Sequence, residues 1–284
     1  MAFCIGASLV APSGSELQLV FTSLEVPGAV FTNAQGINAR GDVVGFYTDA
    51  AGLNHGFRWS RGVYSAIDVP NARVTQARGI GPNGEIVGNY QRVGESGGVP
   101  SHGFLLTRQG EFLPMDYPGH PNTIPQRILP DGTVLGCYHD ADLMGSMHGM
   151  MIAPDGVQEL PEGMSMHNGA TPDRRVIVGL YTDMMDGRGK GYVYEGGALT
   201  PLEVPGSTFT AAWDINASGI IVGVFNDATG AHGFSFDGSS FSRIDVPGAT
   251  ATRVFGINAR GDMVGAYVQG GRTRGFRARW EPVQ

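Results

Sequence analysis

The sequence repeats itself about every 44 residues, and this repeat restricts the chain to a small set of folds. The clearest marker is an aromatic residue that ends a short strand-like segment, and it occurs at Tyr47, Tyr90, Tyr138, Tyr181, Phe225 and Tyr267. Neighbouring markers are 42 to 48 residues apart. This spacing is typical of one four-stranded blade of a β-propeller, so the sequence predicts six blades.

Each copy of the repeat contains four strand-like segments. In the first copy they are 32–37, 43–47, 55–59 and 64–70. The segments alternate apolar and polar residues, are bounded by Gly, Asn, Asp and Pro, and lack a helical period. A tight turn joins the first two segments, and we expect Asn38 and Gly41 to supply its positive φ angles. The predicted class is all-β, with four-stranded antiparallel blades.

An acid, an apolar residue and a proline end the fourth segment of each copy. These endings are Glu25-Val26-Pro27, Asp68-Val69-Pro70, Asp116-Tyr117-Pro118, Glu159-Leu160-Pro161, Glu203-Val204-Pro205 and Asp245-Val246-Pro247. The first ending precedes any complete copy, and the last copy stops after its third segment, 274–280. The N-terminal segment 17–27 is therefore predicted to supply the missing strand and close the ring. We expect a leader at 1–16 and one propeller domain at 17–284.

Composition narrows the possible partners of the protein. The chain has 45 glycines and only 16% charged residues, which favours many tight turns over helices or disorder. The net charge is −7 and no Lys/Arg run occurs, so we expect neither nucleic acid nor a membrane as a partner. Cys4 and Cys137 stand far apart, which argues against a disulfide framework. A secreted, a periplasmic and a cytoplasmic location all stay open, as does the oligomeric state.

Several short motifs carry a family resemblance. They are Gly-Ile-Asn, Val-Gly-x-Tyr, His-Gly-Phe and Asp-Val-Pro-Gly-Ala, and they cover about 17–280. In this pattern the chain resembles the HAF-repeat proteins, which are bacterial propellers often called extracellular repeat proteins. The resemblance implies a propeller and specifies no activity.

Residues that recur in most copies are best explained by the fold. The His-Gly-Phe position holds His55, His102, His148 and His232. One chemical group in four copies points to scaffold, and we expect each histidine to hydrogen-bond a backbone group at the start of a strand. The acids that end the fourth segments, and those two residues after the aromatic marker, are predicted to cap turns.

Functional candidates are positions where one copy departs from the others. A variable position in the first segment holds Gln35, Arg78, Gln126, Asn168, Trp213 and Phe255. Since the first segment lines the central channel of a propeller, four polar residues and two aromatic residues there suggest a small-molecule pocket. The alternative is a wet pore rim that tolerates any polar residue.

Two further departures place charges beside the axis. Other copies have glycine before isoleucine, as at Gly36, Gly79 and Gly256, whereas the third copy has Arg127 and the fifth has Asp214. A buried charge must be solvated, paired or used in chemistry. A pair between the two residues would reach across the channel, either as a structural ion pair or as part of a catalytic site.

A third departure is a group of histidines and methionines. His120, His139 and His167 lie outside the repeated histidine position, and six methionines surround them in sequence: Met144, Met147, Met150, Met151, Met164 and Met166. With Asp140 the imidazoles could hold Zn²⁺, and with thioethers they would suit copper. The spacings match no metal signature, and the alternative is surface histidines beside an apolar loop.

Two classes of function follow. The regular repeats favour a propeller that binds a small molecule or a partner at the channel mouth or on the loop face. The alternative is a hydrolase of esters, lactones or phosphotriesters, by analogy with six-bladed calcium-dependent lactonases and phosphotriesterases. It would use metal-bound water near His139 and His167, or Asp214 as base with Arg78 or Arg127 stabilising an oxyanion. A metal-free lyase or isomerase using Asp214 also stays open.

The carboxylate and asparagine ligands of those calcium enzymes are replaced here mostly by Gln, Arg, Trp and Phe. The sequence therefore argues against a central calcium ion, although a divalent metal (Zn, Cu or Ca) stays a possible cofactor.

Overall fold

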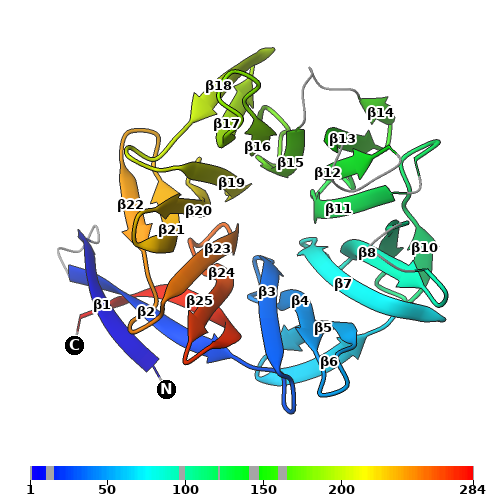
Figure 1. Cartoon of the computed structure of the whole chain (residues 1–284), viewed down its shortest axis with the longest axis horizontal. Helices are drawn as coiled ribbons and strands as arrows, with labels where there is room; N and C mark the ends of the chain where they lie inside the picture. The colour runs from blue at the N-terminus through cyan, green and yellow to red at the C-terminus, as the bar shows by residue number, and fades with distance from the viewer. Residues whose placement is uncertain are drawn as a thin grey trace.

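The computed structural model describes residues 2–10, 16–95, 100–120, 122–140, 147–158 and 165–283. These residues form β-strands joined by turns and loops, and no helix occurs among them (Figure 1). The described part of the chain consequently contains no helix with the length and hydrophobicity needed to cross a membrane. The expected ending Glu159-Leu160-Pro161 and the side chains of Met144 and Met164 lie outside the described residues.

The described strands form three four-stranded sheets, one five-stranded sheet and one eight-stranded sheet. Within them we number successive groups of four antiparallel strands as units 1 to 6. Unit 1 contains β3 (Phe31–Ile37), β4 (Val43–Thr48), β5 (Asn54–Ser60) and β6 (Val63–Ile67). Unit 2 contains β7 (Ala72–Ile80), β8 (Ile86–Arg92), β9 (His102–Leu106) and β10 (Phe112–Pro114). Unit 3 contains β11 (Asn122–Ile128), β12 (Val134–His139), β13 (Met147–Ala153) and β14 (Gly156–Gln158).

The remaining units follow the same order. Unit 4 contains β15 (Ser165–Ala170), β16 (Val176–Thr182), β17 (Gly189–Glu195) and β18 (Ala198–Leu202). Unit 5 contains β19 (Phe209–Ile215), β20 (Ile221–Asp227), β21 (Gly230–Phe236) and β22 (Phe241–Ile244). Unit 6 contains β23 (Ala251–Ile257), β24 (Met263–Gln269), β25 (Arg272–Pro282) and β2 (Glu16–Leu24), with β1 (Ala2–Val10) paired to β2.

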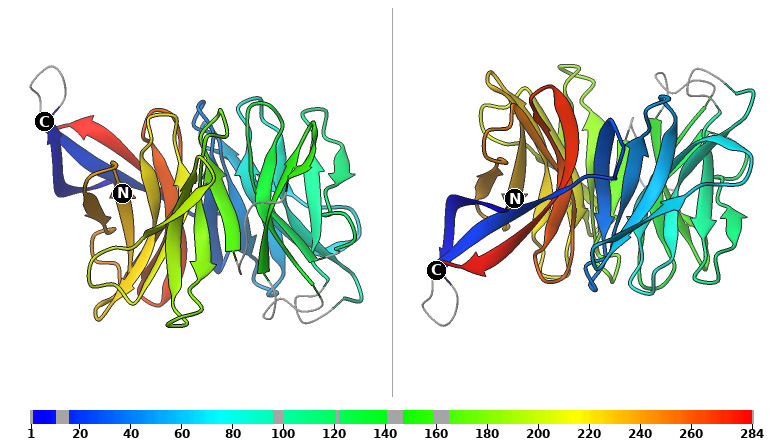
Figure 2. Two further views of the ribbon diagram at one scale, coloured as in Figure 1. Left: turned by 90° about the horizontal axis from the view of Figure 1, so that it is seen from above. Right: turned by 90° about the horizontal axis from the view of Figure 1, so that it is seen from below.

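The units stand side by side around a common axis, with the first strand of each unit innermost (Figures 1 and 2). The innermost strands contact one another in the order β3, β7, β11, β15, β19 and β23, and β23 contacts β3 again. A single parallel bridge between Asn54 and Val74 joins the sheets of units 1 and 2.

Both chain ends contribute to unit 6. β2 pairs antiparallel with β25, from Leu17 opposite Pro282 to Leu24 opposite Gly275, which is the pairing expected of the segment 17–27. The segment 1–16, which we expect to be a leader, contains β1, and β1 pairs antiparallel with β2. A strand that covers the outer edge of β2 satisfies backbone groups that would otherwise be exposed.

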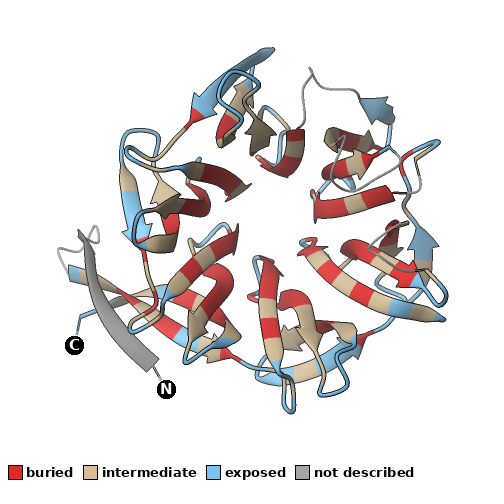
Figure 3. Cartoon of the chain, in the orientation of Figure 1, coloured by how far each residue is buried: buried red, intermediate tan, exposed pale blue. Residues whose placement is uncertain are grey.

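The hydrophobic core lies between neighbouring units. One cluster joins Leu24 and Val264 of unit 6 to Ala34 and Phe57 of unit 1, all of them buried. Buried residues follow the inner strands and exposed residues follow the outer ones (Figure 3). Each unit therefore buries its faces against its neighbours, which explains why the repeat folds as a set.

This packing also explains the glycine of the His-Gly-Phe motif. A Cβ built on Gly233 would lie 2.6 Å from the side chain of Val254, and one on Gly103 would lie 3.0 Å from that of Pro125. In both cases the inner strand of the next unit lies directly against the glycine. Any residue with a Cβ atom at this position would clash with that strand.

The inner turn differs from our expectation at its first residue. Gly41 has a φ of 85°, whereas Asn38 does not have a positive φ. Instead, the side-chain oxygen of Asn38 accepts hydrogen bonds from the backbone N–H groups of Arg40 and Asp42, both at 3.0 Å. Asn38 therefore stabilises the turn through its side chain, and only the glycine supplies the left-handed conformation.

The repeated histidines contact carboxylates, rather than the backbone groups that we expected. His55 stacks on Tyr47 with ring centroids 5.2 Å apart, and its nitrogens lie 2.9 Å from Asp68 and 3.4 Å from Asp49. Asp49 also caps a turn, as predicted, because it accepts hydrogen bonds from the backbone of Ala51 and Leu53. Other units place a basic side chain between acids at the same position: His102, Lys190 or His232.

Replacing His55 with glutamine is expected to destabilise the protein more at pH 5.5 than at pH 8.5. Burial lowers the pKa of His55, but Asp68 and Asp49 together raise it above its ordinary value. Its stabilising effect is therefore complete below pH 6.5 and is lost as the pH rises through the folded-state pKa. Solvent screening limits the effect to about 1 kcal/mol. Urea unfolding of both proteins at the two pH values measures it, and an equal loss at both would contradict it.

Candidate functional site

The variable position of the sequence falls on a β-bulge in every innermost strand. At this position the pairing of each inner strand with the second strand skips one residue: Gln35, Arg78, Gln126, Asn168, Trp213 and Phe255. We call this set the bulge layer. The pairing of β7 also skips Arg73. A bulge re-aims a side chain and is common next to functional sites.

The residue after each bulge lies against the inner strand of a neighbouring unit where it is glycine. It is glycine in four units: Gly36, Gly79, Gly169 and Gly256. A Cβ on Gly79 would lie 2.6 Å from the carbonyl oxygen of Gln126, and one on Gly169 would lie 2.8 Å from Oδ1 of Asp214. Gly169 is followed by alanine and not by isoleucine, so it lies outside the predicted Gly-Ile set, although it directly follows the aligned Asn168. Four glycines thus leave the space that the two charged exceptions fill.

Those exceptions, Arg127 and Asp214, form an ion pair across the axis. Nε of Arg127 lies 3.2 Å from Oδ2 of Asp214, and the residues are only 7% and 8% exposed. The Asp214 carboxylate also accepts hydrogen bonds from the backbone N–H groups of Ile215 and Ile257, both at 3.0 Å. Burial raises the pKa of Asp214, while the charge of Arg127 opposes that rise.

The other N–H groups of Arg127 bind backbone carbonyls of four inner strands. They donate to Arg78 at 3.2 Å, Gln126 at 2.8 Å and Gln35 at 3.2 Å, and also to Phe255. Four of the five N–H groups of the guanidinium thus donate hydrogen bonds, whereas Nε makes only the ion-pair contact with Asp214 and has no hydrogen-bond partner within the described residues. One side chain therefore connects units 1, 2, 3, 5 and 6, and this geometry favours a structural role.

A cavity of about 150 Å³ opens on the turn side of this ion pair. Arg127 and Asp214 form part of its wall, together with apolar residues such as Ile80 and Ile257 and the inner turns. The cavity is small, and the polar groups of the pair are already directed at protein partners.

Arg78 is in a different situation from Arg127. It donates to the side chains of Asn89 at 2.6 Å and Gln76 at 2.8 Å, and it pairs with no carboxylate within the described residues. Burial lowers the pKa of Arg78 to about 10, but the side chain stays cationic at neutral pH. The bulge layer therefore holds a partly exposed cation whose charge has no anionic partner in the described chain.

Three amide oxygens of the same layer have unused hydrogen-bonding capacity. Oε1 of Gln35, Oε1 of Gln126 and Oδ1 of Asn168 are buried and have no hydrogen-bond donor within the described residues. The three residues are at most 3% exposed. Buried polar atoms in proteins almost always have a partner, so these oxygens point to a bound water or ligand.

Units 5 and 6 supply an apolar wall to the layer. The rings of Trp213 and Phe255 meet edge to face with centroids 5.0 Å apart, and they pack on Val224 and Ala266. The structure thus gives the bulge layer one polar side with a cation and one aromatic side, which is the arrangement that the residue types suggested.

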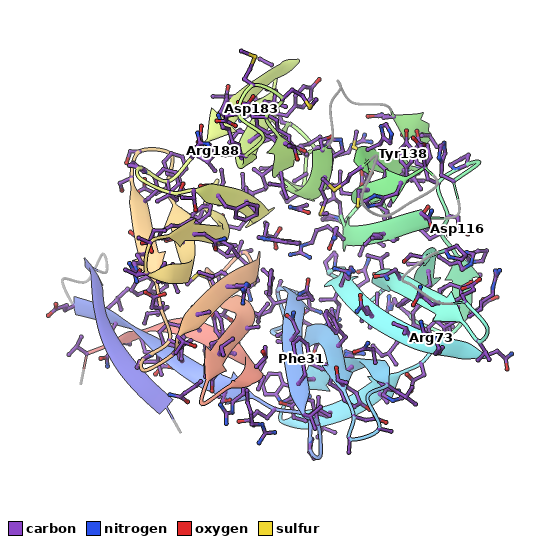
Figure 4. All side chains as sticks on the ribbon, in the orientation of Figure 1. Phe31, Arg73, Asp116, Tyr138, Asp183 and Arg188 are labelled. Atoms are coloured by element: carbon purple, nitrogen blue, oxygen red, sulfur yellow. The ribbon has the colours of Figure 1, made fainter. Side chains whose placement is uncertain are left out.

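The three histidines of the predicted metal group have separate surroundings. His120 lies 3.4 Å from Asp140 and packs on the ring of Tyr138 of β12, which Figure 4 labels. His139 is buried with its Nε2 3.7 Å from the Sγ of Cys137.

His167 is buried at the boundary between units 3 and 4. Its Nδ1 contacts the hydroxyl of Tyr192, and its Nε2 points at Gly149, where a Cβ would be only 2.2 Å away. Burial lowers the pKa of His167 to about 4, so the ring is neutral. Within the described ranges, no three His, Cys, Asp or Glu side chains come together in a group that could hold a metal ion.

Comparison with known proteins addresses the fold alone. No protein-family model and no curated protein sequence matches the chain. Among solved structures, a gluconolactonase from Xanthomonas campestris is similar with a TM-score of 0.56 and 15% identity, covering 94% of this chain and 90% of that one.

Two other solved structures are similar over most of the chain. The β-propeller domain of the Trilobed protease from Pyrococcus furiosus has a TM-score of 0.53 and 11% identity, covering 100% of this chain and 91% of that one. TolB from Acinetobacter baumannii has a TM-score of 0.56 and 13% identity, with 91% and 68% covered. Together with the antiparallel four-stranded units around one axis, these similarities establish that the chain has a β-propeller fold.

Proposed function

We propose that the chain is a six-bladed HAF-repeat propeller, closed by the pairing of β2 with β25, which binds a small organic anion at the bulge layer. One observation carries the proposal: Arg78 has no carboxylate partner in the described chain, while three buried amide oxygens of the same layer lack donors. A ligand that carries both a negative charge and hydrogen-bond donors would satisfy both deficits.

The chemistry of the layer defines the ligand class. The guanidinium of Arg78 suits a carboxylate, because it can offer parallel N–H donors to two oxygens. The orphan oxygens of Gln35, Gln126 and Asn168 require hydroxyl or amino groups on the ligand. The Trp213 and Phe255 rings suit a carbon skeleton. We therefore infer a small hydroxy- or amino-carboxylate, and the protein acts as a binding module.

Calorimetric titration with gluconate, malate and serine tests this function. We expect at least one of them to bind, with glucose and acetate weaker because each lacks one of the two required features. Arg78→Gln should weaken binding about tenfold or more, since it removes a charge-assisted hydrogen bond. Arg175→Gln is a matched control, because that side chain is 74% exposed and remote in sequence. Equal affinities for wild type and Arg78→Gln would contradict the proposal.

A hydrolase is the second candidate, and the similarity to a gluconolactonase over 94% of the chain supports testing it. We favour the binding module, because Arg127 and Asp214 already bind each other and Asp214 accepts two backbone hydrogen bonds. Neither side chain is therefore free to act on a substrate. Turnover of glucono-1,5-lactone, p-nitrophenyl acetate or paraoxon above the buffer rate would favour the hydrolase. Loss of that turnover with EDTA would favour its metal-dependent form.

A further inference from the structure

Six arginines gather on one face of an acidic protein. They belong to units 6 and 1. Arg40 and Arg260 lie in the turns between the first and second strands, Arg61 lies in the turn after β5, and the third strands carry Arg58, Arg277 and Arg279. No Lys/Arg run marks them in the sequence, because each hairpin supplies only one or two. We call this surface the arginine face.

In unit 6 the arginines surround one buried acid. Asp262 is 6% exposed, and its Oδ2 accepts hydrogen bonds from Arg277 at 2.7 Å and Arg260 at 3.0 Å. Arg279 lies 3.6 Å from Oδ1 of the same carboxylate. Burial opposes ionisation, but the hydrogen bond from Arg277 and its neighbours lowers the pKa of Asp262 below its ordinary value. One negative charge thus faces three positive ones.

Unit 1 repeats the arrangement around Asp42. Its Oδ2 accepts hydrogen bonds from Arg58 at 3.1 Å and Arg40 at 3.2 Å, and its Oδ1 accepts one from Ser60 at 2.5 Å. Burial opposes ionisation here too, but Ser60, Asn38 and Arg58 lower the pKa of Asp42 to about 2. With Arg61 exposed beside this group, the two units carry six arginines against two buried aspartates.

The arginines of the two units form one continuous surface. A Cβ on Gly41 of unit 1 would lie 2.9 Å from Arg277 and 3.3 Å from Arg260, so both guanidiniums rest on the neighbouring turn. Arg40 in turn donates to the carbonyl of Pro82 in unit 2 at 2.6 Å. The positive charge therefore extends across units 6 and 1 to the edge of unit 2.

Several donors on this surface lack protein partners. The Nε atoms of Arg58 and Arg277 are buried and have no hydrogen-bond acceptor within the described residues. The side chains of Arg260 and Arg279 are 51% and 50% exposed. The half-exposed guanidiniums of Arg260 and Arg279 offer charged N–H donors to an incoming anion, at positions fixed by the buried Asp262.

Two cavities extend this surface. One of about 450 Å³ is lined by Arg40, Asp42, Arg58, Ser60 and Arg61. The other, of about 480 Å³, lies between units 5 and 6. Its lining includes Arg260, Trp280, three serines (Ser218, Ser235 and Ser242) and one acid, Asp237.

We propose that the arginine face binds an acidic oligosaccharide, with its carboxylates or sulfates on the arginines and one sugar ring in the cavity beside Trp280. Arginine forks match carboxylate and sulfate oxygens. An indole combines an apolar face with one N–H donor, and serine hydroxyls donate and accept, which suits the mixed polarity of a sugar ring. These last groups favour a glycan over an acidic peptide or a nucleic acid.

The test uses hexagalacturonate as the probe and titration calorimetry at 20 and 200 mM salt. The triple variant Arg61→Ser, Arg260→Ser and Arg279→Ser removes exposed charges and leaves Arg58 and Arg277 in place on the buried aspartates. We expect it to weaken binding about tenfold or more, and to weaken the salt dependence. The matched control is the triple variant Arg175→Ser, Arg243→Ser and Arg272→Ser, which changes the net charge by the same amount at other sites. We expect its affinity to be within about twofold of that of wild type.

A second variant separates glycan from general anion binding. Trp280→Ala should weaken hexagalacturonate binding and leave the weak binding of polyglutamate unchanged. The proposal is overturned if wild type does not bind hexagalacturonate, if the triple variant binds as well as its control, or if polyglutamate or duplex DNA binds more tightly. It is also overturned if the fully methyl-esterified, uncharged oligosaccharide binds equally well.

Discussion

Replacing Arg127 with methionine is expected to lower the free energy of unfolding by about 3–5 kcal/mol, because it leaves a buried carboxylate without its counter-ion. Asp214 would keep only the two backbone N–H groups of Ile215 and Ile257 as partners. The carbonyls that Arg127 now binds in other units, such as that of Gln35, would also lose their donor. Equilibrium urea unfolding followed by tryptophan fluorescence measures the loss.

The double variant Arg127→Met with Asp214→Leu identifies the cause. If the unpaired charge dominates, removing it should recover part of the stability, and the two substitutions should be strongly non-additive. Arg175→Met, at a side chain 74% exposed, should cost less than about 1 kcal/mol. A loss at Arg127 as small as that at Arg175 would show that the axial ion pair does not hold the units together.

Replacing Gly223 with alanine should be the next most damaging change, at about 3 kcal/mol, although it adds a single methyl group. A Cβ at this position would lie 2.1 Å from the carbonyl oxygen of Ala211 and 2.6 Å from the ring of Phe234. The oxygen belongs to the adjacent inner strand β19, which cannot move without breaking its pairing with β20. Urea unfolding and thermal melting both report the effect.

Gly52 provides the matched control for this substitution. It has a φ of 84°, and no atom lies within 4 Å of the place that an added methyl group would take, so alanine there meets open space. The cost should be about 1 kcal/mol, from the left-handed backbone alone. If both alanine variants lose the same stability, then conformational preference, and not crowding between strands, explains the glycine of the Val-Gly-x-Tyr motif.

Three arginine environments in one chain illustrate how surroundings set the role of a residue. Arg127 donates four hydrogen bonds to backbone carbonyls and forms an ion pair with Asp214, so it stabilises the fold. Arg78 is held by two neutral amides and keeps its charge available. The side chain of Arg260 is half exposed beside a buried aspartate and faces solvent. Of the three, we expect only the replacement of Arg127 to lower stability strongly.

The sequence by itself determined the strand pattern and the position of the variable residues. The period of the repeat, the polar–apolar alternation and the turn residues are local properties, so they predict units such as β3 to β6 to within about three residues. Comparison of the first segments of the six copies also identified Arg127 and Asp214, because they are charged residues at a position where other copies have glycine. It also indicated that a pair between them would reach across the axis, as it does.

Only the tertiary structure decided which of these residues have unused capacity. Whether Arg127 or Arg78 is fully hydrogen-bonded depends on carbonyls and amides that the fold brings to them, and no spacing in the sequence encodes that. His120, His139 and His167 are near one another in sequence but contact different partners. Conversely, Arg40 and Arg277 are far apart in the chain, and the ring brings them onto one face. A repeat sets the strands, whereas the packing of one unit on the next sets the contacts of each side chain.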